Sequence, residues 1–433
     1  MRFRTGWRLF VATALVAGAC ENGDTAETVL TPTTNASTTT QAVALTPTTT
    51  TSTTTTAAVS SSTRSRVPHD AVVGGTGFQA MLDVTMGGPG LVAVGSTLSG
   101  DSDAAAVWTS SDGVTWSRVP HDEAVLGGPD VQAMWSVTVG GPGLVAVGWD
   151  GLGVDYDAAV WTSPDGVTWS RVPNNEAVFG GPDVQAMWSV TVGGPGLVAV
   201  GWDGLGADYD AAVWTSPDGI IWSRVSDDEA GFDGPGLQAL FGVTAGGPGV
   251  VAVGSAESGD DDDDAAVWTS PDGITWSRVA DDKAVFGGTG AQQMVRVTVG
   301  GPGLVAVGSA ESGDDDNAAV WTSPDGVTWS RVADDKAVFG GTGAQKILDV
   351  TAGRPGLVAV GRDRLGDDDN AAVWTSPDGV TWSRVPHNEA VLGGAGRQTM
   401  AAVTVGGPGF VAVGFDQSGD DRDPAVWVET TQD

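Results

Sequence analysis

A unit of about 53 residues recurs from Val67 almost to the C-terminus, and every copy contains the dipeptide Val-Trp. Successive copies of the dipeptide are 53 or 54 residues apart. Its tryptophans are Trp108, Trp161, Trp214, Trp268, Trp321, Trp374 and Trp427. Self-similarity at such a period is typical of propellers and solenoids, because each unit buries its apolar surface against its neighbours. The repeat therefore constrains the fold much more than the activity.

The unit at 131–172 has the pattern of four short β-strands. We expect these strands at 133–139, 144–148, 158–162 and 167–172. The segment 140–143 (Gly-Gly-Pro-Gly) predicts a type II turn, and 163–166 (Ser-Pro-Asp-Gly) predicts a type I turn. A polar loop is expected at 149–157. Seven such units predict an all-β fold, a seven-bladed β-propeller of four-stranded antiparallel blades.

The two ends of the repeat complement each other. The last unit ends after Trp427 without a fourth strand, whereas an additional Ser-Arg-Val at 65–67 precedes the first unit and matches 170–172. We therefore expect the N-terminal strand to pair into the last blade and close the ring. Closure leaves no exposed sheet edge, and exposed edges promote aggregation. The propeller is expected to span 63–433.

The first 20 residues are organised as a secretory signal. Arg2, Arg4 and Arg8 precede an apolar run at 9–19, which is too short to span a bilayer. The run ends in small residues before Cys20, the only cysteine. This arrangement resembles the bacterial lipoprotein signal, although Ala17 stands where that family usually has Leu. The resemblance implies lipidation of Cys20, and the alternative is an ordinary secretory signal cleaved nearby.

The segment 21–62 is dominated by Thr, Ser and Ala and has few large apolar side chains. Such a composition cannot build a core. It predicts an extended stalk, either a plain disordered linker or an O-glycosylated one. In both cases we expect the stalk to hold the propeller away from the membrane.

The chain is strongly acidic, with 54 Asp and Glu against 20 Lys and Arg and a net charge of −34. Nucleic acid and anionic membrane surfaces would repel it, so we expect neither as a partner. Contact with the membrane is expected through the lipid anchor only. The charge favours cations, basic proteins or neutral glycans, and it favours a soluble monomer.

A motif, Ser-x-Asp-Gly-x-x-Trp, recurs six times between the third and fourth expected strands. Its copies are 110–116, 163–169, 216–222, 270–276, 323–329 and 376–382. The motif resembles the Asp-box, or bacterial neuraminidase repeat, of sialidase-like propellers, but it is one residue shorter between Asp and Trp. The resemblance implies a peripheral, structural motif in which Asp accepts hydrogen bonds from turn amides and Trp packs in the hairpin.

The resemblance does not extend to the catalytic residues of sialidases. That chemistry requires three arginines that grip a carboxylate, a Tyr–Glu nucleophile pair and an Asp acid/base. The Ser-Arg-Val arginines recur at one position in every blade and cannot converge on the axis, and the only tyrosines, Tyr156 and Tyr209, lie in equivalent loops. We therefore identify no catalytic or cofactor-binding residue and expect no enzyme. The near-identity of the units at 131–172 and 184–225 also favours a symmetric scaffold.

Acidic residues concentrate in the loops between the second and third strands. Hard cations such as Ca²⁺ prefer several carboxylate oxygens from a flexible loop. The candidate calcium ligands are Asp150, Asp155, Asp157, Asp260, Asp262 and Asp264. No EF-hand pattern is present, and the other interpretation is a solvated acidic collar that prevents self-association.

Taken together, these features predict an exported, lipid-anchored propeller of the cell envelope or cell surface. We expect it to act as a binding or scaffold protein through its acidic loop face, with an extracellular protein or glycan as partner. The alternatives are a divergent sialidase-like, glycan-active enzyme and a calcium-dependent adhesin.

Overall fold

The computed structural model describes residues 62–431, which belong to one folded unit, Ser61–Asp433. Within this range it leaves out 70–71, 73–76, 100–101, 129–130, 153–154, 182, 206–207, 227–230, 234–235, 258–262, 313–314, 342, 366–367, 408 and 419–420. The predicted signal with Cys20, the stalk up to 61, Asp260 and Asp262 therefore lie outside the described residues.

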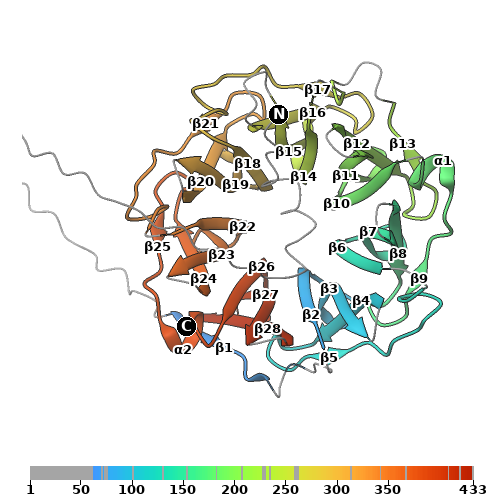
Figure 1. Ribbon diagram of the computed structural model, residues 1–433, viewed down its shortest axis with the longest axis horizontal. Coiled ribbons are helices and arrows are strands. Elements are labelled where there is room, and N and C mark those ends of the chain that lie inside the picture. The colour runs from blue at the N-terminus through green and yellow to red at the C-terminus, as the bar shows by residue number, and fades with distance from the viewer. Residues whose placement is uncertain are drawn as a thin grey trace, which may run out of the picture. The chain divides into compact units, whose positions relative to one another are not determined.

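Seven four-stranded antiparallel sheets are arranged around a central axis, as predicted (Figure 1). The innermost strands are β2 (Gln79–Gly87), β6 (Val131–Gly140), β10 (Val184–Gly193), β14 (Gln238–Gly246), β18 (Gln292–Gly300), β22 (Gln345–Ala352) and β26 (Arg397–Gly406). The second strands are β3 (Gly90–Ser99), β7 (Gly143–Leu152), β11 (Gly196–Leu205), β15 (Gly249–Glu257), β19 (Gly303–Ser312), β23 (Leu357–Leu365) and β27 (Gly409–Ser418). We number the blades 1 to 7 in this order.

The outer half of each blade is less regular than the inner half. The third strands are β4 (Ser102–Ser110), β8 (Asp155–Ser163), β12 (Asp208–Ser216), β16 (Asp263–Ser270), β20 (Asp315–Ser323), β24 (Asp368–Ser376) and β28 (Asp421–Thr431). The outermost strands are β5 (Ser117–Arg118), β9 (Ser170–Arg171), β13 (Ser223–Arg224), β17 (Ser277–Arg278), β21 (Ser330–Arg331), β25 (Ser383–Arg384) and β1 (Ser62–Arg66). Single helical turns, α1 (Glu176–Phe179) and α2 (Glu389–Leu392), lie between blades.

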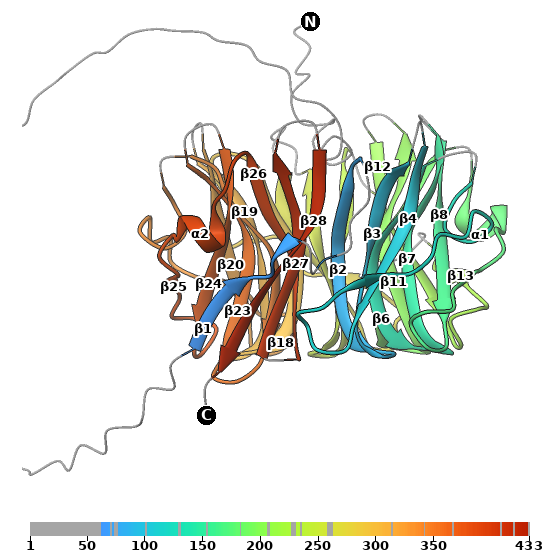
Figure 2. The same ribbon diagram turned by 90° about the horizontal axis from the view of Figure 1, so that it is seen from below.

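The predicted closure of the ring is confirmed. Strand β1 pairs antiparallel with β28, and the last sheet has the order β1-β28-β27-β26. In this register Arg66 lies opposite Trp427, as Arg171 lies opposite Trp161 in blade 2. The N-terminal strand therefore supplies the outermost strand of blade 7, and Figure 2 shows it along the outside of the ring.

The fourth strand is shorter than predicted, because the repeated motif uses the amides that would extend it. In blade 2 the Asp165 carboxylate accepts hydrogen bonds from the amides of Val167 and Thr168 at 2.9 and 2.6 Å. The Trp169 indole donates to the carbonyl of Gly166 at 3.0 Å. Only Ser170 and Arg171 remain for the sheet ladder.

Two further predictions about blade 2 were wrong in detail. Most of the expected loop at 149–157 is strand, because β7 extends to Leu152 and β8 begins at Asp155. The turn at 140–143 has only Gly141 and Pro142 between its paired residues, with φ +56° at Gly141. Positive φ at the first central residue is typical of type II′ hairpins, which continue the natural twist of the strands.

A β-bulge interrupts every innermost strand at the same place. In blade 2 the register shifts between Met134 and Ser136, so Trp135 is the additional residue. The backbone of the bulged strand approaches Gly148 on β7 so closely that a Cβ there would lie 1.8 Å from the Ala133 carbonyl oxygen. The bulge therefore explains why the second strand of every blade contains glycine at this position.

The apolar core is divided into seven layers, each lying between two neighbouring blades. The layer between blades 1 and 2 contains Trp161 and Trp169, which are 0% and 7% exposed. These tryptophans are core residues, as expected from their size and repetition. No helix in the described part of the chain is long and apolar enough to cross a membrane.

Candidate functional site

The predicted calcium ligand Asp150 belongs to a polar network that links three strands of blade 2. Its carboxylate accepts a hydrogen bond from the Gln132 side-chain amide at 2.7 Å and forms an ion pair with Arg171. The Arg171 guanidinium lies over the ring of Trp161, 5.6 Å from its centre. Blades 3, 6 and 7 repeat this Gln–Asp–Arg arrangement. Asp150 therefore has structural partners that a bound cation would have to displace.

The aspartate of this network is missing in blades 1, 4 and 5, where Thr97, Ala256 and Ala310 take its place. Ala310 stands in its place in blade 5, and Arg331 donates directly to the Gln292 side chain at 2.9 Å. Blade 4 has the same direct contact at 3.3 Å. In blades 4 and 5 the glutamine therefore takes over the arginine, whereas in blade 1 the side-chain amide of Gln79 has no hydrogen-bond partner among the described residues.

Of the other predicted calcium ligands, only Asp157 lies next to Asp150 among the described side chains. Asp157 lies opposite Asp150 on β8 and accepts a hydrogen bond from Asn174 at 2.8 Å; burial raises the pKa of Asp157. Asp264 is 2% exposed and pairs with Lys283 at 2.8 Å. The side chain of Asp155 is not described. Among the described residues, no three His, Cys, Asp or Glu side chains form a group that could hold a metal. The calcium site stays a prediction.

The seven blades differ from one another at two positions close to the axis. One is the additional residue of the bulge: Leu82, Trp135, Trp188, Phe241, Val295, Leu348 or Ala401. The other is the residue that follows the close-approach glycine on the second strand: Ser96, Trp149, Trp202, Ser255, Ser309, Arg362 or Phe415. Tryptophan occupies both positions in blades 2 and 3 and neither position elsewhere.

These tryptophans form two equivalent modules, one in each blade. In blade 2 the ring centres of Trp135 and Trp149 are 4.8 Å apart, and Tyr156 meets Trp149 edge-on at 6.0 Å. The corresponding distances in blade 3 are 4.8 Å and 5.9 Å. The blade 3 module consists of Trp188, Trp202 and Tyr209.

The two modules are in contact and continue into blade 4. The ring centre of Trp188 lies 4.1 Å from that of Trp135 and 5.5 Å from that of Trp149. The ring centres of Phe241 and Trp202 are 6.0 Å apart. We call this set the aromatic shelf; its members are Trp135, Trp149, Tyr156, Trp188, Trp202, Tyr209 and Phe241. Trp135, Trp149, Trp202 and both tyrosines keep part of their surface exposed. Aromatic rings packed edge to face but partly accessible provide a preformed apolar surface.

The hydrogen bonding of the shelf is incomplete. The indole nitrogens of Trp135, Trp149, Trp188 and Trp202 are buried, and none of them reaches an acceptor among the described residues. A buried donor without an acceptor is unfavourable, commonly by about 1–3 kcal/mol, and calls for a bound water or ligand. The shelf therefore combines apolar rings with unused N–H donors.

Basic residues gather on the other side of the axis. Lys346 on β22 lies opposite Arg362 on β23, and Figure 1 places these strands across the ring from β6 and β7. The Lys346 ammonium donates to the neutral side chain of Gln293 at 2.6 Å. Burial, and then the charge of Arg362, lower the pKa of Lys346 to about 8. Arg362 and Arg364 both contact the Asp369 carboxylate at 3.2 Å.

Two half-buried carboxylates join neighbouring innermost strands. Asp83 accepts hydrogen bonds from the amide of Val84 and, in blade 2, from the amide of Val137. Asp349 joins blades 6 and 7 in the same way. Ser136 has the equivalent position in blade 2 and accepts from Val190 of blade 3 at 3.3 Å. Because serine fills the same role in blade 2, the main role of these two carboxylates is structural: each links two neighbouring innermost strands. We call Asp83 and Asp349 the clasps.

The clasps nevertheless have unusual protonation. Burial raises the pKa of Asp349 to about 7, although the positive charge of Arg296 opposes the shift. Burial also raises the pKa of Asp83. Both oxygens of each carboxylate already accept backbone amides, which leaves little capacity for proton transfer to a substrate.

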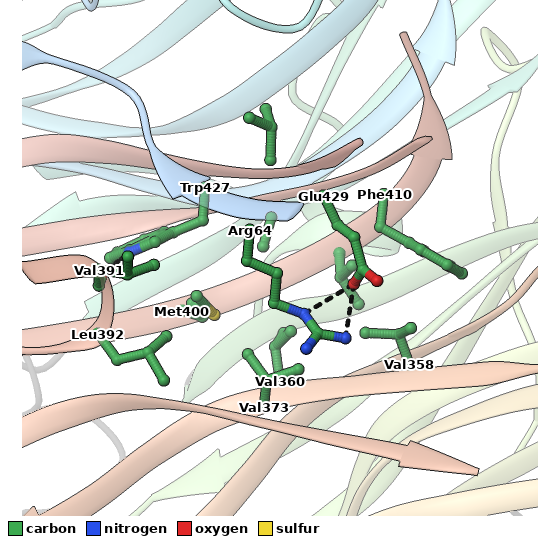
Figure 3. A pocket seen from close by; sticks show the side chains of 13 residues that line it. Arg64, Val358, Val360, Val373, Val391, Leu392, Met400, Phe410, Trp427 and Glu429 are labelled. Atoms are coloured by element: carbon green, nitrogen blue, oxygen red, sulfur yellow. Dashed lines mark hydrogen bonds and ion pairs between the residues drawn. The ribbon is translucent and has the colours of Figure 1, made fainter. Parts of the chain in front are cut away.

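A small cavity of about 30 Å³ lies in the core layer beside the closing strand (Figure 3). Arg64 lies at the cavity and donates to the Glu429 carboxylate at 2.7 Å. Its other lining residues are mostly apolar, including Val360 and Met400. A space of this size admits about one water molecule. The cavity is a packing defect of the inter-blade core and no ligand site.

Comparisons with known proteins give structural neighbours of low similarity and no family. No protein-family model and no curated protein matches the chain. Among solved structures, the chain is similar to a Trypanosoma rangeli sialidase in complex with sialic acid (11% identity, TM-score 0.46, 84% of this chain and 58% of that one). It is also similar to a Bombyx mori β-fructofuranosidase in complex with sucrose (12%, 0.32, 82% and 90%). These values are too low to support an argument about activity or ligand.

The aromatic shelf was missed in the sequence, although a signal for it exists there. The chain has 18 tryptophans, of which 13 occupy the Val-Trp dipeptides and the repeated motif. Apart from Trp7, the remaining ones are Trp135, Trp149, Trp188 and Trp202. Alignment of the repeats position by position would have isolated them. The emphasis on near-identity between blades 2 and 3 hid their difference from the other five.

Proposed function

We propose that the protein is an exported, non-catalytic binding protein of the cell envelope, which recognises an extracellular ligand through the aromatic shelf. The observation that carries this proposal is the confinement of the four non-repeating tryptophans to two adjacent blades. An inner layer that served packing alone would need no such difference, because Ser96, Ser255 and Ser309 fill the second-strand position in blades 1, 4 and 5.

The wider setting supports binding more than catalysis. The rings of the shelf are partly accessible, and apolar, aromatic surfaces of this kind are typical of ligand-binding sites. The indole N–H donors lie buried beside them without an acceptor among the described residues. Lipidation of Cys20 and a Thr-rich stalk would present the propeller outside the cell. The acidic loops around the shelf would repel anionic surfaces and favour neutral or basic ligands.

The test is a binding screen of the purified protein against arrays of extracellular glycans and peptides. Its matched comparison is the double variant Trp149→Ser, Trp202→Ser, which introduces the residue found in blades 1, 4 and 5. Ser309→Ala, at the equivalent position of blade 5, is the control. We expect ligands that bind the wild type and the control but not the double variant. Ligands retained by the double variant would place the binding site elsewhere.

A glycan-active enzyme is the second candidate. Asp349 favours it, because its pKa is raised to about 7 and it lies within electrostatic reach of Asp83 and Arg296. A carboxyl group with a raised pKa is what general acid catalysis requires. Turnover of chromogenic glycosides that is abolished by Asp349→Ser would establish this candidate. Absence of turnover over pH 5 to 8 would reject it for the glycosides tested.

A calcium-dependent adhesin is the third candidate, carried over from the acidic loops. Calcium titration with Mg²⁺ as the control, in the wild type and in Asp157→Asn, would test it. Saturable heat that is lost in the variant would assign the metal to the β7–β8 hairpin. Equal heats for both cations would leave the loops as a charge collar.

A further inference from the structure

We propose that the aromatic shelf binds a proline-rich, basic segment of a partner protein in the polyproline II conformation. This inference rests on the proposed function, because it assigns a ligand class to the same surface. Hydrogen-bonding inventory, spacing and charge support it separately.

The first support is the hydrogen-bonding inventory of the shelf. The indole N–H donors of Trp135, Trp149, Trp188 and Trp202 have no acceptor among the described residues, but they are buried in the free protein. A ligand carbonyl therefore reaches them only when the rings turn. A proline-rich backbone offers carbonyl acceptors and lacks an N–H at each proline. A proline-rich backbone therefore brings acceptors and few donors, whereas the indoles of the shelf are donors without acceptors. A sugar brings a hydroxyl donor with nearly every acceptor and would require additional acceptors from the protein.

The second support is the spacing of the two modules. The ring centres of Trp149 and Trp188 are 5.5 Å apart and those of Trp188 and Trp202 are 4.8 Å apart. The equivalent residues Trp149 and Trp202 are consequently separated by at most about 10 Å. One turn of a polyproline II helix contains three residues and advances about 9 Å. Two prolines one turn apart can therefore meet equivalent rings of the two modules.

The third support is the negative charge around the shelf. Burial and then the nearby Asp103 carboxylate raise the pKa of Tyr156, so this carboxylate lies within electrostatic reach of the shelf. Asp157 follows Tyr156 directly on β8. With a net charge of −34, the chain attracts ligands with flanking basic residues and repels acidic ones.

The preformed geometry of such a ligand suits a rigid shelf. Polyproline II segments are already extended, so that docking them on aromatic grooves costs little conformational entropy. The shelf itself is built on strands of three adjacent blades, namely β6, β7 and β8, β10, β11 and β12, and β14. The ligand therefore has little to order on binding, which favours recognition without a closing lid.

The test uses the whole protein and three synthetic probes in isothermal titration. The first probe is a decaproline with two arginines at each end, and the second replaces the prolines by alternating Gly and Ser. The third is a neutral oligosaccharide, a hexamer of N-acetylglucosamine. We expect the decaproline to bind about tenfold more tightly than its Gly-Ser analogue, and Trp149→Ser and Trp202→Ser each to weaken it about five- to tenfold. Ser309→Ala should bind like the wild type.

The outcomes separate this inference from the function on which it rests. Equal binding of both peptides, or decaproline binding that survives the tryptophan variants, would overturn the polyproline assignment. Saturable binding of the oligosaccharide alone, lost in the same variants, would overturn the ligand class and leave the shelf as the binding site. If no probe binds, the polyproline assignment is rejected, and the array screen with the double variant decides the proposed function. If every interaction survives the variants, both the inference and the proposed function are rejected.

Discussion

The tryptophans of this protein form two groups that differ in their hydrogen bonds. Trp161, from the repeated group, is fully buried and donates to the carbonyl of Val125 at 2.7 Å. Twelve of the repeated indoles donate to a backbone carbonyl in this manner, at 2.7 to 3.0 Å. Trp149, from the shelf, is partly exposed and reaches no acceptor among the described residues.

This difference separates the positions that hold the ring together from those that distinguish one blade from another. The repeated indoles are satisfied by carbonyls of the surrounding chain and help to hold the ring together. The four shelf indoles occur only in blades 2 and 3, near the axis, and have no acceptor among the described residues. The predictions below separate these two kinds of position, beginning with the largest expected effect.

Truncation of a repeated tryptophan should be the most damaging change. We expect Trp161→Ala to lower the free energy of unfolding by about 3–5 kcal/mol, because it removes a fully buried ring and leaves the carbonyl of Val125 unpaired. Denaturant titration followed by circular dichroism measures this loss. If Trp149→Ser costs as much as Trp161→Ala, the shelf is ordinary core and the comparison fails.

The clasp at Asp349 should make stability depend on pH. Its pKa is about 7 in the folded protein and close to 3.8 in the unfolded chain, so the folded state binds the proton more tightly. The stabilising contribution is complete below about pH 4 and is lost as the pH rises through 7, by about 2–4 kcal/mol in the free energy of unfolding.

The matched variant for this effect is Asp349→Ser, since Ser136 fills the equivalent position. Unfolding midpoints at pH 5 and pH 8 should differ less in the variant than in the wild type. An unchanged difference would show that the pH dependence arises from other carboxylates.

Removal of a shelf tryptophan should cost little stability and much binding. Trp149→Ser and Trp202→Ser are expected to lower the free energy of unfolding by about 1–2 kcal/mol each, because these rings are only partly buried. Ligand affinity should fall at the same time. Thermal unfolding and titration of the same samples give both values, and a large loss of stability without loss of binding would reverse the assignment.

The smallest effect is expected at the predicted calcium ligand in the polar network. Asp150→Ala should cost no more than about 1 kcal/mol, because Gln132 can take over Arg171 as Gln292 holds Arg331 in blade 5. A double-mutant cycle of Asp150→Ala with Gln132→Ala measures this substitution of partners. Additive losses would show that the two side chains do not share the arginine.

The architecture was predictable from the sequence because the repeat and its two incomplete ends determine blade number and closure. The bounds of the outer strands were not, since the short fourth strand depends on where the Asp165 carboxylate directs its hydrogen bonds. The extension of β7 and β8 into the expected loop was also missed. There the cross-strand pairs of Asp150 with Asp157 and of Gly151 with Tyr156 continue the ladder.

The acidic residues illustrate a limit of composition as evidence. A cluster of aspartates in the sequence predicted a cation site, yet Asp150 and Asp264 pair with Arg171 and Lys283. These partners are distant in sequence and become neighbours only when the blade forms. The shelf, in contrast, was visible as a local departure from the repeat and needed only a comparison between blades.

The most direct test of the account is a ¹⁵N-indole NMR titration of the protein with the arginine-flanked decaproline, with signals assigned by single Trp→Phe variants. We predict that the indole signals of Trp135, Trp149, Trp188 and Trp202 shift during the titration, whereas those of the repeated tryptophans stay in place. Shifts confined to the repeated tryptophans, or no shift at any of the four shelf indoles, would contradict the claim that the aromatic shelf is the binding site.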